Sequence, residues 1–272
     1  MRQTVKKMVD KVPYVDRKLA QIRDLKTDIG VLQLEKGDLE AKVRKLTELN
    51  SNIRALLATR FIRGNGIEIG ATYLPTKLPS RTKVRYVDEA LNSELLKRYP
   101  DLKGHDLAPV SIVDNAEKLS AFKGGSLDFI IANHFLEHCQ DPLGTIINMS
   151  KKLTAKGTLF FAIPDKRYTF DRQRPVTPFK HLLLEHRKPT SEMRFRHFKE
   201  ASELLEHKKG SAIESRAKEL MAIGYSIHYH VWRQQDMMEM FIRLIEGFKL
   251  DLEIKAMVAS GNEVIFILRK AV

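Results

Sequence analysis

The chain has 272 residues, a formal net charge of +13 and 43% hydrophobic residues. This hydrophobic content excludes wholesale disorder and is typical of a globular protein with one large domain and an accessory element. No run approaches the roughly 18 apolar residues of a membrane span, and the charged N-terminus lacks the apolar core of a signal peptide. The single cysteine, Cys139, excludes an internal disulfide. We therefore expect a cytoplasmic protein without a transmembrane segment, peripheral at the membrane only through partners.

The basic excess has two interpretations. A positive protein attracts acidic partners such as nucleic acid, an anionic membrane face or a phosphorylated substrate, and it also stays soluble. The lysines and arginines are scattered through the whole chain, with no basic tract interleaved with aromatic residues. We therefore expect no specific nucleic-acid partner.

The first predicted element is a long helix with a heptad repeat. One seam position carries Ile22, Ile29, Lys36, Val43, Asn50 and Leu57, and the other carries Leu25, Leu32, Leu39, Leu46 and Ile53. β-branched residues at the first position and leucine at the second favour a parallel two-stranded coiled coil, in which a buried Asn50 would fix the register. We predict self-association through a coiled coil within residues 1–59. The alternative is a helix that folds back on the domain that follows it.

After residue 60, apolar runs alternate with helix-like segments. The predicted strands are Gly66–Ile69, Lys83–Asp88, Val110–Asp114, Leu127–Asn133 and Thr158–Ile163, and the predicted helices are Ser93–Arg98 and Leu143–Leu153. This alternation predicts a parallel sheet covered by helices. A helix over Gln234–Ile245 then precedes the strands Leu252–Val258 and Val264–Leu268, whose short connection makes them antiparallel. The expected fold is α/β: a Rossmann-like, mostly parallel sheet with an antiparallel C-terminal hairpin, preceded by the helical coiled coil.

Four predicted strands end in polar residues, in chain order Glu68, Asp88, Asp114 and Asn133. In an open parallel sheet, ligands bind at the carboxyl ends of the strands. These side chains are therefore expected to form one continuous cleft, which indicates an enzyme.

The order of these motifs and the terminal hairpin resemble the class I S-adenosylmethionine-dependent methyltransferases. The segments IANHFLEHCQDP and LFFAIPDKRYTFDRQRPVTPFKHLL are similar to the members associated with glycosyltransferases and surface-polysaccharide synthesis. The resemblance extends from about Arg60 to the C-terminus. It implies a methyltransferase domain over residues 60–272, with residues 165–230 inserted as a cap over the acceptor site, and S-adenosylmethionine as the cofactor.

The resemblance also implies which residues bind the cofactor: Glu68, Gly70, Ala71, Asp88, Asp114, Asn115, Ala116, Asn133 and His134. Gly70 would let the backbone approach the cofactor closely. Asp88 would accept hydrogen bonds from two ribose hydroxyls. Glu68 would organise the methionine end, Asp114 and Asn115 would read the adenine edge beside Ala116, and Asn133 and His134 would line the cleft next to the methyl group. ATYLP follows Gly70 in place of the usual further glycines, so the contacts of the first loop are expected to differ. Pro75 and Pro79 indicate that the helix that usually comes next is short or missing.

Two other functions match shorter patterns. A strand-terminal Asp88 also suits the ribose of a nicotinamide cofactor, but GNGIEIG lacks the G-x-G-x-x-G spacing of a dehydrogenase. The run His134–His138 matches the H-x-x-E-H pattern of some zinc peptidases. It begins at a strand end and meets Pro142 within a turn, so we expect no metal there and interpret His138 as a structural residue or part of the cleft wall.

The segment from Pro164 to His197 is expected to overhang the cleft and to hold the acceptor. Its candidate substrate-binding residues, with two from the later IHYHVW run, are Arg167, Tyr168, Asp171, Arg174, His197, His230 and Trp232. Arginine suits phosphate or carboxylate, and aspartate suits sugar hydroxyls. The candidate catalytic residues are His134 and His181 as bases and Asp165 as an orienting or proton-accepting acid.

These observations predict methyl transfer to a hydroxyl of a sugar in a surface glycan or its precursor, with glycosyltransferases as partners. Two alternatives stay open. One is methylation of RNA or protein, which the net charge favours. The other is an inactive coiled-coil scaffold with a methyltransferase fold, which the altered first loop suggests.

Overall fold

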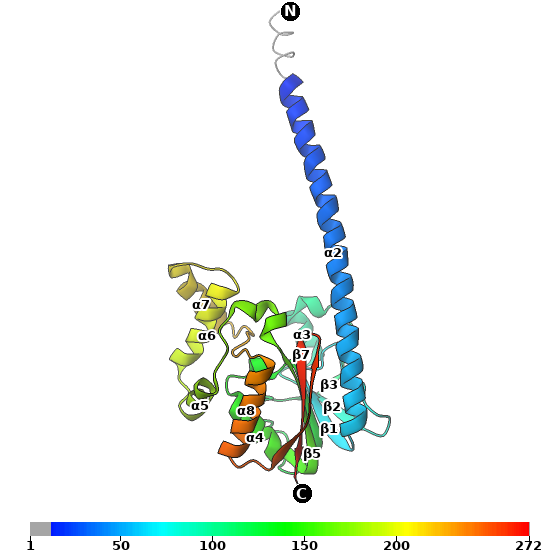
Figure 1. The fold of residues 1–272 in the computed structure, drawn as a ribbon, viewed down its shortest axis with the longest axis vertical. Helices are drawn as coiled ribbons and strands as arrows, with labels where there is room; N and C mark the ends of the chain where they lie inside the picture. The colour runs from blue at the N-terminus through cyan, green and yellow to red at the C-terminus, as the bar shows by residue number, and fades with distance from the viewer. Residues whose placement is uncertain (1–11, 272) are drawn as a thin grey trace, which may run out of the picture. The chain divides into compact units, whose positions relative to one another are not determined.

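The computed structural model describes residues 12–271, which divide into two compact units between Glu48 and Leu49. Each unit is described by itself (Figure 1). The helices are α2 (Val12–Phe61), α3 (Asn92–Arg98), α4 (Pro142–Lys152), α5 (Phe179–Arg187), α6 (Ser191–Leu204), α7 (Ser211–Ala222) and α8 (Gln234–Gly247). The strands are β1 (Asn65–Ile69), β2 (Lys83–Asp88), β3 (Val110–Val113), β4 (Leu127–Asn133), β5 (Leu153–Pro164), β6 (Leu252–Ser260) and β7 (Glu263–Lys270). Short 3₁₀ turns are η1 (Pro100–Leu102), η2 (Leu136–His138), η3 (Lys166–Tyr168) and η4 (Phe170–Gln173).

The first unit is a single helical segment. The predicted long helix is confirmed, since α2 runs from Val12 to Phe61. Seam residues before Glu48, including Leu25, Leu32 and Leu39, expose their side chains within this chain. The side chain of Ile22 lies outside the part of the chain that the structure describes.

The last turns of α2, from Leu49 onward, belong to the second unit and pack on its sheet. Ile53 and Leu57 contact a buried cluster that includes Ile131. Asn50 is buried, donates from Nδ2 to Asn262 Oδ1 at 2.9 Å and accepts a hydrogen bond from Ser260 Oγ at 2.9 Å. The prediction that Asn50 sets the register of a coiled coil is therefore wrong. Its amide is used within the chain because the β6–β7 turn offers it two polar partners.

The sheet has the strand order β3-β2-β1-β4-β5-β7-β6. All pairs among β1–β5 are parallel, and β7 is antiparallel to both β5 and β6. This confirms the predicted Rossmann-like sheet with a C-terminal hairpin. The strand order reverses between β1 and β4, and Ile69 at the end of β1 pairs with Val87 and Ala132. The carboxyl ends of β1, β2 and β4 therefore come level at a topological switch point, where α/β sheets bind ligands.

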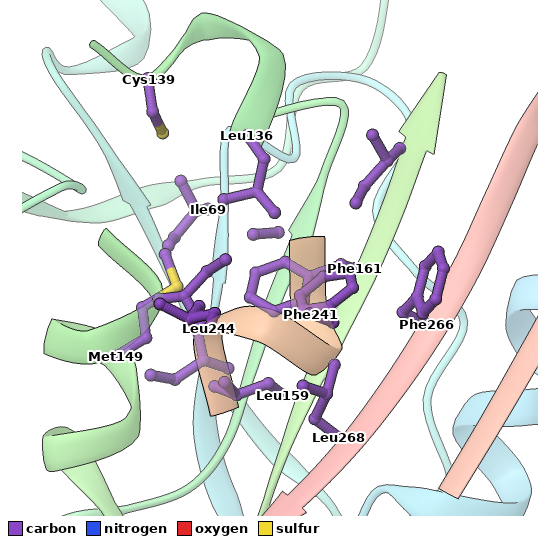
Figure 2. Packing of buried hydrophobic residues seen from close by; sticks show 14 of the residues in the cluster. Ile69, Leu136, Cys139, Met149, Leu159, Phe161, Phe241, Leu244, Phe266 and Leu268 are labelled. Carbon is purple, nitrogen blue, oxygen red and sulfur yellow. The ribbon is translucent and has the colours of Figure 1, made fainter. Parts of the chain in front are cut away.

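Alternating side chains of β4, β5 and β7 divide between two buried clusters. Phe161 and Phe266 point to one face of the sheet, where they pack with Phe241 of α8 and residues of α4 (Figure 2). Phe160 and its neighbours point to the other face, which Ala58 and Ile62 at the end of α2 cover. Because both faces are buried, the central residues of these strands, such as 129–132 and 159–163, form continuous apolar runs. Each such phenylalanine contributes about 1.5–3 kcal/mol by leaving water.

The connection after β1 contains no helix up to β2, as the prolines in this segment led us to expect. The segment between β5 and α8 is more structured than its sequence suggested. It contains α5, α6 and α7, and α6, α7 and the residues after them enclose a small apolar core around Phe198, Leu220 and Ile227. Thr190 begins α6 by accepting from the backbone N–H of Met193. Within residues 12–271, no helix combines the length and apolar character that crossing a bilayer requires.

Candidate functional site

A pocket of about 430 Å³ lies at the carboxyl ends of β1, β2 and β3, and we call it the strand-end pocket. Its wall includes five of the residues that the sequence assigned to the cofactor, namely Gly70, Asp88, Asp114, Asn115 and Ala116. Apolar side chains, among them Leu95 and Phe135, complete it. A pocket of this size, whose wall combines apolar side chains with a similar share of polar and charged ones, can hold a small molecule.

Gly70 sits at the turn that follows β1. Its φ is +61°, and a Cβ built on it would meet no atom within 4 Å. Its N–H donates to the carbonyl of Val87 at 3.0 Å, which holds the turn beside β2. Because the space beside Gly70 belongs to the pocket wall, the missing side chain leaves room for a ligand to approach the backbone.

Asp88 is the last residue of β2, and its side chain accepts a hydrogen bond from the backbone of the turn that follows. Its Oδ1 accepts from the N–H of Glu89 at 2.7 Å, and the described part of the chain provides no partner for Oδ2. Burial raises the pKa of this carboxyl above its ordinary value, while the Glu89 N–H opposes the change. A ligand with two adjacent hydroxyls would restore the hydrogen bonds that burial removes.

The loop after β3 is held by its own side chains. Asp114 Oδ2 accepts from the N–H of Ala121 at 2.8 Å, and Asn115 Oδ1 accepts from the N–H groups of Glu117 and Lys118 at 3.0 and 3.2 Å. This fixes the loop and leaves the amide nitrogen of Asn115 for other contacts. Ala116 adds a small apolar surface to the same wall. These groups fit the polar edge and flat face of an adenine.

Two of the predicted cofactor residues lie behind the strand-end pocket. Glu68 is buried and accepts from the backbone N–H of Thr76 at 3.0 Å and from its hydroxyl at 2.7 Å. Asn133 Nδ2 donates to the same hydroxyl at 2.9 Å. Burial raises the pKa of Glu68, against the hydrogen bonds from Thr76. This network anchors the loop that carries Gly70 and Ala71, and neither Ala71 nor the two polar residues line the pocket.

His134 follows β4 with a φ of +49° and turns toward the C-terminal hairpin. Its Nε2 lies 2.7 Å from Glu263 Oε2, and Glu263 also pairs with Arg54 of α2. Burial alone would lower the pKa of His134, but the hydrogen bond to Glu263 and the charge of Glu137 outweigh it and raise the pKa. His134 lines neither the strand-end pocket nor its neighbour. Glu263 therefore occupies the ring of the predicted base, and the local sequence around His134 does not reveal this distant carboxylate.

A second pocket of about 670 Å³ adjoins the first, and we call it the acceptor pocket. Its wall comes from η4, α6, α7 and the segment after α7, and includes Thr169, Phe170, Arg172, Gln173, Glu206, His207 and His228. His138, Tyr225 and Ser226 line both pockets. The two cavities therefore share a wall, and His138 is a basic side chain within it.

His138 lies at the end of η2, and its tautomer follows from its contacts. Its Nδ1 is 3.0 Å from the carbonyl oxygen of Ile227 and 3.1 Å from Ser226 Oγ. A carbonyl oxygen can only accept, so Nδ1 carries the proton and Nε2 keeps a free lone pair. Burial lowers the pKa of His138, the charge of His228 acts in the same direction, and Glu137 opposes both. The sequence analysis placed His138 on the cleft wall but did not name it as a base, although the H-x-x-E-H run drew attention to it.

Three of the predicted substrate-binding residues are internal. Trp232 is 1% exposed and belongs to the main core, so it offers no platform to a sugar. Arg174 is also buried, donating to Asp171 at 2.9 Å and to the carbonyls of His228 and Tyr229. Asp171 accepts in turn from His228 Nδ1 at 2.6 Å. The charged residues that predicted a binding surface here instead form ion pairs and hydrogen bonds within the insertion.

Asp165 is buried at the end of β5 and is also occupied by the chain. It accepts from Arg167 Nη2 at 2.7 Å and from the N–H of Gln234, the first residue of α8, at 3.2 Å. Burial would raise the pKa of Asp165, but these hydrogen bonds lower it. Arg167 and Tyr168 are exposed and line neither pocket. Asp165 thus joins β5 to α8 and does not reach either pocket.

The remaining three predicted residues, His181, His197 and His230, come together around Glu185. His197 Nε2 is 2.7 Å from Glu185 Oε1, His181 Nε2 is 3.1 Å from the same oxygen, and His230 Nε2 is 3.5 Å from Oε2. Burial opposes ionisation of Glu185, but the neighbouring imidazoles of His181, His197 and His230 outweigh it and lower its pKa to about 2. The cluster lines neither of the two large pockets.

The sequence of residues 44–219 matches a family described as "Methyltransferase domain", and the match spans well over half of the chain. Comparison with curated proteins gave no match. Among solved structures, the chain resembles a suggested S-adenosyl-L-methionine-dependent methyltransferase from Methanococcus maripaludis at 15% identity, covering 87% of this chain and 92% of that chain with a TM-score of 0.44. It resembles a possible histamine N-methyltransferase from Thermotoga maritima at 13% identity, covering 86% and 95% with a TM-score of 0.44.

A third solved structure is the CurJ carbon methyltransferase, which is similar at 14% identity and a TM-score of 0.41. The match covers 77% of this chain, and this chain spans 49% of the CurJ chain. The strand order, the strand-end pocket and the family match agree with one another. The chain therefore belongs to the methyltransferase-domain family and is an enzyme that uses S-adenosyl-L-methionine as its methyl donor.

Proposed function

We propose that the enzyme methylates a hydroxyl group of a sugar, with the cofactor in the strand-end pocket and the sugar in the acceptor pocket. The observation that carries the proposal is the wall shared by the two pockets, formed by His138, Tyr225 and Ser226. A methyl donor and a nucleophile must meet in line, so two adjoining cavities separated by a base suit this reaction.

The lining of the acceptor pocket supports a sugar more than an apolar acceptor. Phe170 and Tyr225 expose aromatic rings, which suit the apolar face of a sugar. Gln173 and Glu206 offer hydrogen-bonding groups for hydroxyls, and Arg172 suits a phosphate or carboxylate. An acidic or phosphate-linked sugar would use all of these groups.

Within this proposal, each residue has a defined task. Asp88 would bind the ribose of the cofactor, Asn115 and Ala116 would bind its adenine, and Gly70 would admit its methionine end. When bound there, S-adenosyl-L-methionine supplies an electrophilic methyl group on a sulfonium. His138 Nε2 would accept the proton of the acceptor hydroxyl, and its Nδ1–H stays fixed by the carbonyl of Ile227.

The association with a surface glycan rests on the sequence resemblance of the segments around residues 131–142 and 159–183. Glycosyltransferases as partners, a cytoplasmic location and a cap formed by residues 165–230 belong to the same proposal. The acceptor pocket supports the cap, because residues 165–230 supply every lining residue except His138.

A labelling experiment tests the acceptor class. The full chain is incubated with methyl-labelled S-adenosyl-L-methionine and, separately, with nucleotide sugars, isolated cell-envelope glycans, a mixed RNA and a protein extract. We expect label in a carbohydrate that survives protease and ribonuclease treatment. Label only in RNA or protein would contradict the proposal, and so would label in a carbohydrate at a nitrogen or carbon atom.

We also propose that the helical unit before Glu48 pairs with a second copy of the chain as a parallel coiled coil. Its seam residues Leu32 and Leu39 are exposed within one chain, and burying them between two chains would stabilise the pair. The double variant Leu32→Asp and Leu39→Asp should therefore halve the mass measured by light scattering.

The matched control is Leu34→Asp, because Leu34 is exposed on the same helix but lies off the seam. It should keep the mass of the unmodified chain. A monomeric unmodified chain, or equal effects of the control and the seam variants, would contradict the coiled coil.

A further inference from the structure

We propose that His181, Glu185, His197 and His230 form a zinc site that joins three segments of the insertion. Neither the family match nor the proposed reaction requires such a site, so the inference stands independently of the proposed function. It rests on the convergence, burial and unsatisfied atoms of these four side chains.

The fold brings the four residues together from separate elements. His181 and Glu185 lie four residues apart on α5, so they share one face of that helix. His197 comes from α6, and His230 comes from the segment that leads into α8. One ligand atom from each residue can be chosen so that all four lie within 4.8 Å of one another.

The distances between the candidate ligand atoms are comparable with those between ligand atoms around one zinc ion. The three imidazole Nε2 atoms lie 2.7, 3.1 and 3.5 Å from oxygens of the Glu185 carboxylate. In tetrahedral zinc sites with bonds of about 2.0–2.1 Å, ligand atoms are about 3.3 Å apart. The rings of His181 and His197 are nearly perpendicular, as are those of His197 and His230, at 89° and 80°. These rings are therefore not stacked on one another, which is compatible with separate ligands around one ion.

The hydrogen bonds of the chain alone leave this cluster unsatisfied. Within the described residues, His230 Nε2, His181 Nε2 and Glu185 Oε2 are buried without a hydrogen-bond partner. Only His197 is well aligned with Glu185. A buried polar atom without a partner is costly, so three of them around one point are unusual unless a ligand is bound. A divalent ion would satisfy all three at once.

The donor set and its closure favour a structural zinc ion. Imidazole nitrogens with one carboxylate suit zinc, and four protein ligands complete a tetrahedral shell with no open position for a substrate. His230, His197 and Glu185 are buried, whereas the side chain of His181 is 38% exposed and gives the ion a way in. The segments that the ion would link also reach the strand-end pocket. Arg194 and Tyr229 line that pocket, and they also line a small cavity whose wall includes Glu185 and His197.

A metal titration of the full chain tests the site. The protein is stripped with a chelator, and zinc alone is added back while bound metal and the thermal midpoint are measured. We expect one zinc per chain and a higher midpoint with zinc, because an ion that binds only the folded state stabilises it. Glu185→Gln and His181→Gln should each weaken zinc binding well over tenfold, since losing even a residue that only hydrogen-bonds a metal ligand costs about 10–100-fold.

Two controls make the result specific. His186→Gln changes the neighbouring histidine on α5, which pairs with Asp141 at 2.8 Å, and should bind zinc like the unmodified chain. His228→Gln changes a second group, Glu137, His138 and His228, whose ligand atoms also lie within 4.8 Å of one another, and should likewise keep its zinc. Circular dichroism confirms that each variant is folded, and His181→Gln is the safer ligand variant because that side chain is partly exposed. Failure of the unmodified chain to bind zinc, equal binding by both ligand variants, or loss of zinc in His228→Gln would overturn the proposal.

Discussion

Replacing Asp88 with alanine should weaken the binding of S-adenosyl-L-methionine about 100-fold. Asp88 lines the strand-end pocket, and Oδ2 has no partner among the described residues. A hydrogen bond to a charged group contributes about 1.5–3 kcal/mol, so two bonds to ribose hydroxyls make a loss of about 3 kcal/mol a conservative expectation. Because each 1.4 kcal/mol corresponds to about tenfold in affinity, this equals about two orders of magnitude. Calorimetric titration with the cofactor measures the change.

The matched control for Asp88 is Glu94→Gln. Glu94 is an exposed carboxylate at the start of α3 that pairs with Arg98 and does not line the pocket. It should leave cofactor affinity unchanged. An Asp88→Ala protein that is folded and binds the cofactor as tightly as the unmodified chain would place the ribose elsewhere. No binding by the unmodified chain at millimolar cofactor would instead support the inactive scaffold.

Replacing His138 with glutamine should slow methyl transfer about 100- to 10,000-fold, the usual contribution of a positioned general base. Glutamine keeps a similar length and can still donate to the Ile227 carbonyl, but it cannot take up a proton near neutral pH. Cofactor affinity should change little, because the loss concerns proton transfer. Single-turnover rates at saturating acceptor, with cofactor binding measured in parallel, separate the two effects.

The pH dependence gives the same test a second readout. The groups around His138 are Glu137, His134 and His228, and burial together with His228 holds the pKa of His138 below 6.5. A base must be neutral to act, so the rate should be constant above this value and fall only in more acidic solution. In His138→Gln, the rate of methyl transfer should no longer fall in more acidic solution. His105→Gln, an exposed histidine outside both pockets, should keep the rate and the profile of the unmodified enzyme. An unchanged rate in His138→Gln would exclude it as the base.

The sheet was predictable because local pattern and burial agree. Apolar runs alternate with helix-like segments, a polar residue ends β2 and β4 and directly follows β3, and the short β6–β7 turn allows only an antiparallel pair. The places of Asp88 and Asp114 were predictable from this pattern, since strand ends in a parallel sheet must meet at one edge. Gly70 and Asn115 were predicted from the family resemblance. The parts of the pocket wall that these strand ends form can be predicted without knowing which distant residues contact them.

The residues that were misassigned depend on partners far away in the sequence. The heptad spacing predicts that Asn50 lies in a coiled-coil seam, but its partners Asn262 and Ser260 lie at the other end of the chain. His134 reads as a cleft base, but Glu263 binds its ring. The sequence around a polar residue does not show whether a carboxylate or amide of the distant C-terminal hairpin will contact it. Tertiary hydrogen bonds therefore decide which polar residues are free for chemistry.

The insertion shows the same limit in its histidines. Spacing on α5 predicts that His181 and Glu185 share a face, but it does not reveal that His197 and His230 meet them. A cluster of polar residues in the sequence was interpreted as a substrate surface because exposure could not be judged. Trp232 and Arg174 are buried, so neither offers its side chain to a substrate. The acceptor pocket is lined by other residues, among them residues of η4, α6 and α7.

Hydrogen–deuterium exchange with and without S-adenosylhomocysteine tests most directly whether the strand-end pocket is where the cofactor binds. The amides of residues 70–72, 88–92 and 114–118 should exchange more slowly when the compound is bound, because they form or follow the pocket wall. Unchanged exchange in all three segments at saturating compound, or protection confined to another part of the chain, would contradict the account.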